Sequence, residues 1–547
     1  MKHKYLVISL LAIVLINILV GIWRVRIDLS TEHRYSLQPS TKQLLKSIDT
    51  PADITVYLSG NLNSGFTKLK NATADIVKEM SVYTHLTYHV ENPTDMDDDN
   101  LHALNQSLQK ESLHPISVFE RQKDGKQVTE LVYPFAKVQA GSKSLWVELL
   151  VNQRGKSGAE NLNTSIENLE YQFVNALQML NAKERKKIAL IEGHGELDEL
   201  HTADLEYLLA KRYDVYRGTI TDEANCLSPF AAIIIADPQL PFSEKDKFII
   251  DQYIMQGGAV FWAVNGVQFS SEVLTDEGFT PALPLDLNIT DLLFKYGIRV
   301  NNRILQDLQC LSEPVDVSQN PQIPQYQPMP LVFSPLLLTS SGSPVTRNVS
   351  PVSTPFASDI DIVGEDNNLK HIILLASSEY ATLVPTPSKI DLEDLSVAPS
   401  RFTLSYLPVA VATEGQFSSL YAHRAVPQNV KSGDKRSLSV GTRQIVVAAG
   451  SVLRNERSRN ETLPMGYDRY SRTQFGNRDF MNNSILFLTG EDDIISLKNK
   501  TLELRLLNQQ LTNRNISIYQ TLAIALPLIL LALVGVGFIF IRKKIVI

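Results

Sequence analysis

Cysteine is scarce in this chain of 547 residues, which contains only Cys226 and Cys310 and no CxxC motif. Thiol–disulfide exchange depends on closely spaced cysteines, so thiol redox chemistry is not expected here. In an oxidising compartment the two cysteines could form a disulfide, and otherwise they would be buried free thiols. The sequence alone leaves both alternatives open.

Motifs that identify several common enzyme classes are also absent. The sequence contains no GxxxxGK(S/T) phosphate loop, no GxSxG turn and no HExxH zinc motif. We therefore expect no nucleotide hydrolysis through a phosphate loop and no chemistry of those hydrolase or metalloprotease types. The net charge of −7 gives no electrostatic reason to expect nucleic acid as a partner.

Charged residues are missing from two long apolar runs, at residues 5–23 and 518–541. As helices with a rise of about 1.5 Å per residue, both runs approach or exceed the roughly 30 Å of a bilayer's hydrocarbon core. We expect a transmembrane helix in each end segment, 1–27 and 517–547. A cleaved signal peptide is the alternative for the first run, although RVRIDLST after it offers no small-x-small cleavage site. A buried helix of a soluble protein is the alternative for the second run.

Basic residues beside the second run predict the orientation of the chain. Arg542, Lys543 and Lys544 follow the run directly, and such residues favour the cytoplasmic side of a membrane. Basic residues flank the first run on both sides, so it gives no clear preference. Two spans place both termini on the same side, and we therefore expect cytoplasmic termini with an extracytoplasmic body between them.

The body begins with a pattern that predicts a small α/β domain at residues 28–160. Strand-like segments at 52–60 and 85–93 flank a helical pattern at 66–84, and short strands with glycine turns follow. This order is loosely thioredoxin-like.

A strongly amphipathic helix is expected next, at residues 161–186, as a connection to the following domain. Asn163 or Thr164 could cap this helix, and Glu167 is placed for a capping box. Its apolar face consists of Ile166, Leu169, Phe173, Leu177 and Leu180.

The larger domain is expected at residues 187–490. The segments KKIALIEGHGE, AAIIIADP, AVFWAVNG and RQIVVAAGS read as buried strands that alternate with helices, which predicts a doubly wound parallel sheet. A stretch rich in proline and serine indicates a long insertion of extended segments at about 310–440. Residues 491–516 are expected to form a helical stalk that leads into the second span.

The order of these strands resembles the class I glutamine amidotransferase-like fold. Enzymes of that fold carry a nucleophilic cysteine on a sharp turn after a central strand. The corresponding stretch here, residues 261–266, reads FWAVNG, and neither cysteine of the chain lies at such a turn. Without a thiol this chemistry cannot be built, so we expect a shared fold without the activity.

One glycine-flanked turn at the end of the first strand of the larger domain carries candidate site residues. Carboxyl ends of parallel strands are where doubly wound folds place their sites, and three carboxylates with two histidines could bind a metal. The alternative is a structural turn that needs its glycines and exposes its polar side chains, and we expect this alternative, with no catalytic residue, metal or cofactor. The residues concerned are Glu192, Gly193, His194, Gly195, Glu196, Glu199 and His201.

Several segments, in this order between two spans, resemble the gliding-motility ABC transporter component (GldG) family, within the wider group of ABC-transporter auxiliary proteins. The resemblance covers nearly the whole chain and rests on the order of the segments, since no single motif is catalytic. The matching segments are residues 26–60, 163–180, 186–197, 333–345, 356–363, 407–424 and 475–508.

This resemblance implies an ABC permease and a separate cytoplasmic ATPase as partners in the inner membrane of a bacterium, with the body in the periplasm. It also implies a role in gliding motility or an associated export process. The function expected is therefore that of a non-enzymatic, substrate-binding-like accessory subunit. Two alternatives stay open: a periplasmic enzyme or metal-binding protein that uses the turn from Glu192 to Glu196, and an envelope structural protein that binds cell-wall or motility components.

Overall fold

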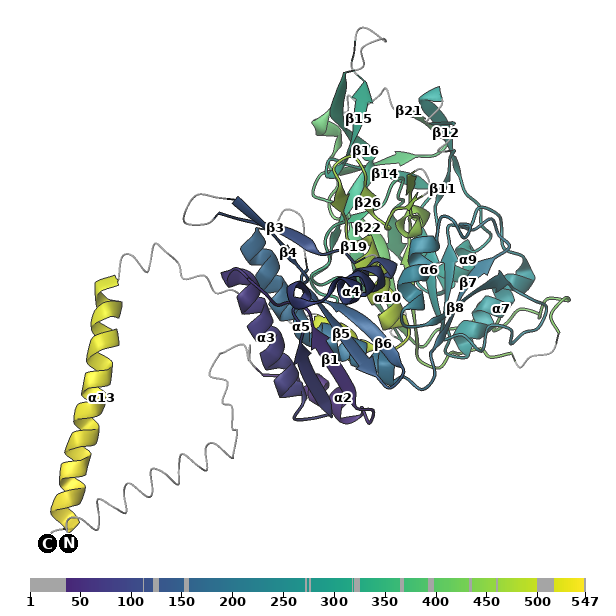
Figure 1. Cartoon of the computed structure of the whole chain (residues 1–547). Helices are drawn as coiled ribbons and strands as arrows, with labels where there is room; N and C mark the ends of the chain where they lie inside the picture. Colours follow the sequence, from purple (N-terminus) through teal and green to yellow (C-terminus); the bar gives the residue numbers. More distant parts are fainter. Residues whose placement is uncertain are drawn as a thin grey trace. The chain divides into compact units, whose positions relative to one another are not determined.

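The computed structural model describes residues 36–111, 113–121, 127–151, 157–270, 273–274, 277–316, 318, 325–364, 368–391, 398–431, 435–458, 461–498 and 516–545 (Figure 1). Residues Tyr35–Lys500 form one compact unit, and the C-terminal helix belongs to a separate unit. The first expected span, residues 5–23, lies outside the described residues.

A four-stranded sheet of order β2-β1-β5-β6 forms the centre of the smaller domain. β1 and β2 are parallel, whereas β5 runs antiparallel to β1 and forms a hairpin with β6. The strand–helix–strand order with a later hairpin is the expected one, and the thioredoxin comparison stays a prediction. The elements of this domain are α2 (Pro39–Lys46), β1 (Ala52–Val56), α3 (Ser64–Met80), β2 (Leu86–Val90), α4 (Asp98–Lys110), β3 (Ile116–Arg121), β4 (Gln127–Val132), β5 (Phe135–Ala140) and β6 (Lys143–Glu148).

Helix α5 (Gly158–Asn181) contacts α3, β5 and β6, so it covers the small sheet and does more than connect two domains. The Ser157 hydroxyl accepts a hydrogen bond from the Glu160 N–H, and the Glu160 carboxylate accepts one from the Ser157 N–H at 2.7 Å. This capping box satisfies the first N–H groups of the helix. The expected caps at Asn163 or Thr164, with Glu167, are therefore wrong, and the helix begins earlier.

The larger domain is built on one mixed sheet of order β15-β16-β19-β22-β23-β10-β9-β7-β8, with β17 paired to β16. Along the chain, β8 is added on one side of β7 and β9 on its other side. This reversal makes the carboxyl ends of β7 and β9 the switch point at which open α/β sheets hold ligands. The parallel strands are β7 (Lys187–Glu192), β8 (Asp214–Thr219), β9 (Ala232–Ala236), β10 (Ala259–Ala263) and β23 (Thr442–Val447).

The other half of this sheet is antiparallel, which the expected doubly wound parallel sheet did not include. Its strands come almost entirely from the proline- and serine-rich region expected as an insertion at about 310–440. They join the main sheet because they carry apolar runs: in β22 five consecutive residues are buried. These strands are β15 (Cys310–Asp316), β16 (Tyr326–Thr339), β19 (Leu369–Ala376) and β22 (Pro408–Gly415).

Short strands from the same region and the region after β23 surround this half of the sheet. β14 pairs with β20 and contacts β16. The short strands are β11 (Val267–Gln268), β12 (Phe279–Pro284), β13 (Ile298–Val300), β14 (Arg303–Asp307), β17 (Val352–Ser353), β18 (Ile360–Ile362), β20 (Ala381–Pro385), β21 (Ser388–Asp391), β24 (Arg457–Ser458), β25 (Glu461–Thr462), β26 (Tyr467–Asp468) and β27 (Thr473–Gln474).

Helices cover the parallel half of the sheet, so that every residue of β9 and β10 is buried. α10 contacts β10, β23 and α6, and α7 contacts β10. Right-handed crossovers in opposite directions place α6 and α7 on opposite faces. One apolar cluster includes residues of both domains, such as Leu45, Leu177 and Ile494. The helices are α6 (Ala203–Ala210), α7 (Glu244–Met255), α9 (Thr290–Lys295), α10 (Asn477–Leu488) and α11 (Asp492–Lys498).

The C-terminal part of the chain contains α11 and α13 (Ile516–Ile545). α11 lies at the start of the expected stalk at 491–516, but it packs against α2, α5 and α10 and buries its apolar side chains in the main core, so this segment belongs to the body. Residues 499–515 lie outside the described part. α13 includes the second apolar run, 518–541. Along α13 the residues with described side chains are interrupted by others. Among the described residues alone, no helix is long and apolar enough to cross a membrane. The two membrane spans stay a prediction.

Candidate functional site at the carboxyl ends of the parallel strands

The turn after β7 is a tight turn held against the end of β9. Gly193 and Gly195 have φ values of 116° and 72°, in a region that L side chains rarely adopt. The His194 carbonyl accepts hydrogen bonds from the N–H groups of Gln239 and Leu240, both at 2.8 Å. This turn therefore occupies part of the switch point itself.

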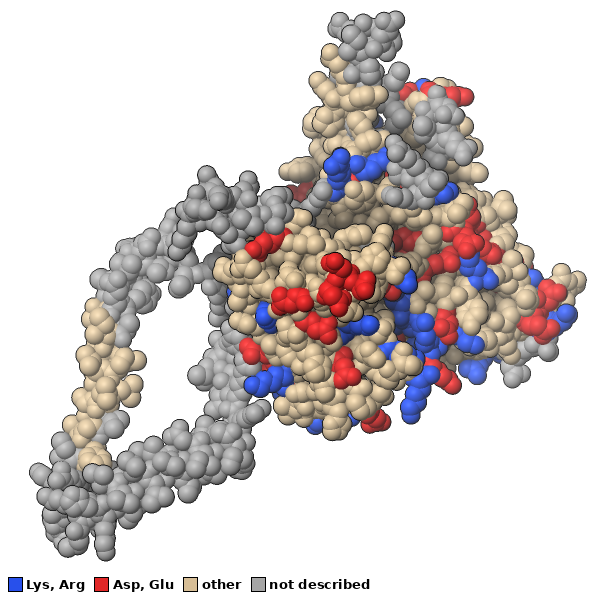
Figure 2. All heavy atoms as spheres, viewed as in Figure 1, with Lys and Arg blue, Asp and Glu red and all other residues tan. Residues whose placement is uncertain are grey.

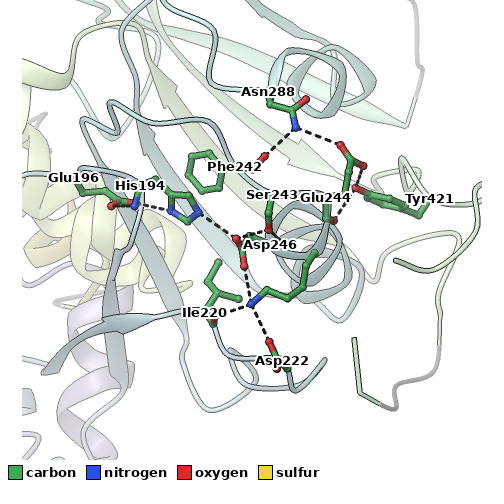
Figure 3. Close-up of polar contacts among 11 residues, drawn as sticks. His194, Glu196, Ile220, Asp222, Phe242, Ser243, Glu244, Asp246, Asn288 and Tyr421 are labelled. Carbon is green, nitrogen blue, oxygen red and sulfur yellow. Dashed lines mark hydrogen bonds and ion pairs between the residues drawn. The ribbon is translucent and has the colours of Figure 1, made fainter. Parts of the chain in front are cut away.

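The His194 side chain lies between two carboxylates and is 7% exposed. Its Nδ1 is 2.9 Å from Glu196 Oε1, and its Nε2 is 3.3 Å from Asp246 Oδ2 in the first turn of α7 (Figure 3). The ring stacks on Phe242 with centroids 3.7 Å apart. Asp246 also accepts a hydrogen bond from Ser243, the N-cap of α7, at 2.6 Å. The turn is thus tied to the start of α7 through a buried imidazole.

The two carboxylates keep the imidazole protonated. Burial acts to lower the pKa of His194, but hydrogen bonds and charges from Asp246 and Glu196 outweigh it and raise this pKa to about 9. Burial acts to raise the pKa of Asp246, and its hydrogen bond to His194 contributes to lowering that pKa below its ordinary value. A protonated imidazole donates from both nitrogens and has no lone pair for a metal ion. Within the described residues, no group of three or more potential metal-binding side chains occurs.

The other candidate residues lie apart from His194. Arg217 Nε is 2.8 Å from Glu192 Oε1, and Arg217 Nη1 is 2.6 Å from Glu206 in α6. His201 Nδ1 is 2.6 Å from Asp198, and Glu199 is exposed. These residues are close together in the sequence, but in the structure they belong to separate interactions. The expectation that a structural turn would expose its polar side chains is wrong for His194 and Glu196, because they bury their charges against each other.

A second polar group at this edge of the sheet was not recognised from the sequence. Asp237 follows β9 with a φ of 56°, and its Oδ1 accepts hydrogen bonds from Asn265 Nδ2 at 2.6 Å and Gln239 Nε2 at 2.9 Å. Asn265 follows β10, and its Oδ1 accepts from the Gly450 N–H at 2.8 Å, just after β23. Three neighbouring parallel strands thus end in one hydrogen-bonded group.

This group forms part of the wall of a cavity of about 410 Å³, within the usual size range of ligand pockets. Burial raises the pKa of Asp237 to about 6, against the opposing influence of Arg454 and Gln239. Other lining residues come from the antiparallel half of the sheet and the segments after β23, among them Phe356, Ser451 and Tyr467. A polar residue within two positions of the end of each buried strand was the available signal in IIIADP and FWAVNG.

Neither cysteine is placed as a nucleophile. Cys226 and Cys310 are free thiols and are not bonded to each other. Burial, with the nearby Asp307 charge, raises the pKa of Cys310 to about 11, so this residue is a thiol at neutral pH. The stretch 261–266 ends with Asn265 and Gly266 at the sheet edge and contains no cysteine.

Acidic and basic side chains are interspersed on the face of the body shown in Figure 2. Over α4, acidic side chains gather, with Asp97 as the N-cap and Asp98 and Asp99 in the first turn.

Comparisons with known proteins concern mainly the larger domain. A family model described as "ABC-type uncharacterized transport system" matches residues 185–484, more than half of the chain, and one for a domain of unknown function (DUF7088) matches residues 31–139. A Borreliella burgdorferi protein described as uncharacterized is 24% identical over 429 residues, which cover 76% of this chain and 78% of that protein.

Among solved structures, the mmIFT52 N-terminal domain aligns with 56% of this chain and 97% of its own length. The identity is 14% and the TM-score is 0.32, which is too low to support an argument about the fold. The match at residues 185–484, by contrast, begins just before β7 and ends within α10, and it includes both the His194 turn and the cavity. The chain belongs to the ABC-type uncharacterized transport system family, as an auxiliary component of an ABC transport system.

Proposed function

We propose that this auxiliary component is a non-enzymatic subunit with a periplasmic body, held in the bacterial inner membrane by two spans. It works with an ABC permease and a separate cytoplasmic ATPase. The family match supports the association with other transporter components. The absence of a phosphate loop from the sequence agrees with ATP hydrolysis by another chain.

The observation that carries the non-enzymatic part is the state of the switch point. An activated nucleophile or a bound metal ion at this position would indicate an enzyme. Here the His194 nitrogens are both engaged by carboxylates, the polar residue that follows β10 is Asn265 and not a cysteine, and Asp237 is bound through one oxygen to two amide side chains. These groups fix the geometry of the sheet edge and offer no activated nucleophile.

The link to gliding motility, or to an export process associated with it, is also part of the proposal. It rests on the resemblance of segments such as residues 186–197 and 407–424 to the gliding-motility transporter component. The substrate of the transporter is left open by this resemblance.

Purified full-length protein tests the enzymatic alternative. We expect that neither the wild-type protein nor a His194→Gln variant hydrolyses ATP or model esters, peptides and glycosides. We also expect neither protein to contain stoichiometric zinc. Hydrolysis that disappears in the His194→Gln or Asp237→Asn variant would contradict the proposal. Bound zinc that is lost in the His194→Gln variant would favour the metal-binding alternative.

A further inference from the structure

The cavity beside Asp237 is assembled from segments that lie far apart in the sequence. Asp237 and Asn265 come from the parallel strands, Phe356 from the region after β17, and Arg454 and Tyr467 from the region after β23. Convergence of polar groups from several elements in an aromatic cavity is characteristic of a ligand site. We propose that this cavity binds a small organic cation, a protonated amine, whose ammonium group pairs with the Asp237 carboxylate.

Asp237 is held with one oxygen engaged and one available. Its Oδ1 accepts from Asn265 and Gln239, whereas its Oδ2 accepts no hydrogen bond from any described residue. The backbone reaches this position with a φ of 56°, which Asp tolerates better than most residues. Gly450 makes room for the side chain, because a Cβ atom at that position would lie 2.1 Å from Asp237 Oδ1. The carboxylate is therefore fixed before a ligand arrives, which lowers the entropic cost of binding.

Charges around the cavity favour a cation over an anion. Its lining contains the carboxylates of Asp237, Glu456 and Asp468 and the guanidinium of Arg454. A second guanidinium, that of Arg469, lies beside the lining over the Tyr470 ring, so carboxylates still outnumber the cations. The Asp468 carboxylate is oriented by the N–H groups of Tyr470 and Ser471, at 3.1 and 3.0 Å. An ammonium group entering here would meet an excess of negative charge, whereas a phosphate or carboxylate ligand would meet repulsion.

Aromatic rings supply a second means of recognising a cation. Phe269 and Phe356 lie with ring centroids 4.2 Å apart, and Tyr467, Tyr470 and Phe475 also line the cavity. The face of an aromatic ring attracts a cation, more strongly where water is excluded. The apolar rings would also cover the carbon skeleton of the ligand. A volume of about 410 Å³ accommodates an amine with several carbons. This inference rests on the cavity and not on which complex the chain joins.

Calorimetric titration of the full-length protein with putrescine and with n-butylamine, both protonated at neutral pH, tests the proposal, with uncharged 1,4-butanediol and glucose as comparison probes. We expect saturable binding of at least one of the two cations and weaker or no binding of the uncharged probes. In Asp237→Asn, the affinity for the cation should be about tenfold or more lower, since a charge-assisted hydrogen bond is lost. Asn retains the oxygen that Asn265 and Gln239 bind, and it tolerates positive φ, so this variant should fold.

Two further variants separate the site from general charge effects. Glu456→Gln removes a second carboxylate inside the cavity and should weaken binding by a smaller factor. Glu199→Gln removes the same charge from an exposed position outside the cavity and should leave binding unchanged. Equal affinity for cations and uncharged probes, or unchanged cation affinity in Asp237→Asn, would overturn the proposal. Failure of the wild-type protein to bind either cation would also overturn it.

Discussion

His194 and Asp237 lie at the ends of neighbouring parallel strands, but the groups that surround their charges differ. The His194 imidazolium lies between two carboxylates, so its charge is balanced within the protein. The Asp237 carboxylate meets amide groups and no ion partner within 4 Å among the described residues. One residue therefore contributes mainly to stability, and the other is available to a ligand.

The His194 ion pairs predict a specific pH dependence of stability. The pKa of His194 is about 9 in the folded protein against an ordinary value of 6.5. Its stabilising contribution is therefore fully present below a pH of about 6.5 and is lost as the pH rises through about 9. In urea unfolding at a pH of about 6, His194→Gln should be less stable than wild type by about 3 kcal/mol.

This difference should shrink when unfolding is measured above a pH of about 9. The matched control is His201→Gln, because the His201 side chain is partly exposed and pairs with one exposed carboxylate, that of Asp198. An equal loss of stability at both pH values would show that the His194 contribution is packing and not charge.

The conformation of the turn predicts sensitivity to a Cβ atom at Gly195. Its φ is 72°, and a Cβ there would lie 3.2 Å from the Cβ of Gln239. Gly195→Ala should lower the free energy of unfolding by about 1–2 kcal/mol, as measured by chemical denaturation. Gly218→Ala is the control, since that glycine has no positive φ and a Cβ there would meet nothing within 4 Å. Similar losses in both variants would contradict the conformational explanation.

At the scale of elements, α5 and the mixed sheet show how the sequence patterns translate into structure. The apolar face of α5 was evident from Leu169, Phe173 and Leu177, which are all buried. Its start was not, because Asn163 and Ser157 are both good caps and only the Glu160 side chain selects Ser157. β15 and β16 escaped the sequence pattern because the prolines in 314–355 indicate a loop more strongly than a strand. β19 and β22 lie beyond that stretch but within the region interpreted as an insertion.

The capping box of α5 gives a prediction that distinguishes the two starts. Ser157→Ala should destabilise the protein by about 1 kcal/mol, because the Glu160 N–H loses its acceptor. Thr164→Ala lies within the helix and should change stability little. Thermal unfolding of both variants provides the measurement. If Thr164→Ala destabilised the protein more than Ser157→Ala, the helix would begin at the later position.

The sequence predicted only part of the site, because some of its residues are close together along the chain and others are far apart. The glycines and carboxylates of the turn are local in sequence, and their structural role was inferred from the strand before them. The partner of His194, Asp246, is 52 residues away in helix α7, so no local pattern reveals the pair. The cavity requires Asp237, Asn265 and Gly450 together, and only the pairing of β9, β10 and β23 brings them into contact.

At the scale of the whole molecule, the proposed topology has two membrane spans, a periplasmic body and both termini in the cytoplasm. A reporter that is active only in the periplasm, inserted at the exposed turn between β5 and β6 at residues 141–142, should be active. The same reporter fused after Ile547 should be inactive, because the basic residues that follow the second run favour the cytoplasm. Activity of the C-terminal fusion with an inactive insertion would reverse the proposed orientation.

The most direct test of the central claim is purification of the tagged full-length protein from its native membranes, followed by identification of the bound proteins. An auxiliary transporter subunit should retain an ABC permease and an ATPase that carries a phosphate loop, in reproducible proportions. The Asp237→Asn variant, in which only the cavity is changed, should retain both. Recovery of the chain without any permease or ATPase, from membranes in which those proteins are present and intact, would contradict the account.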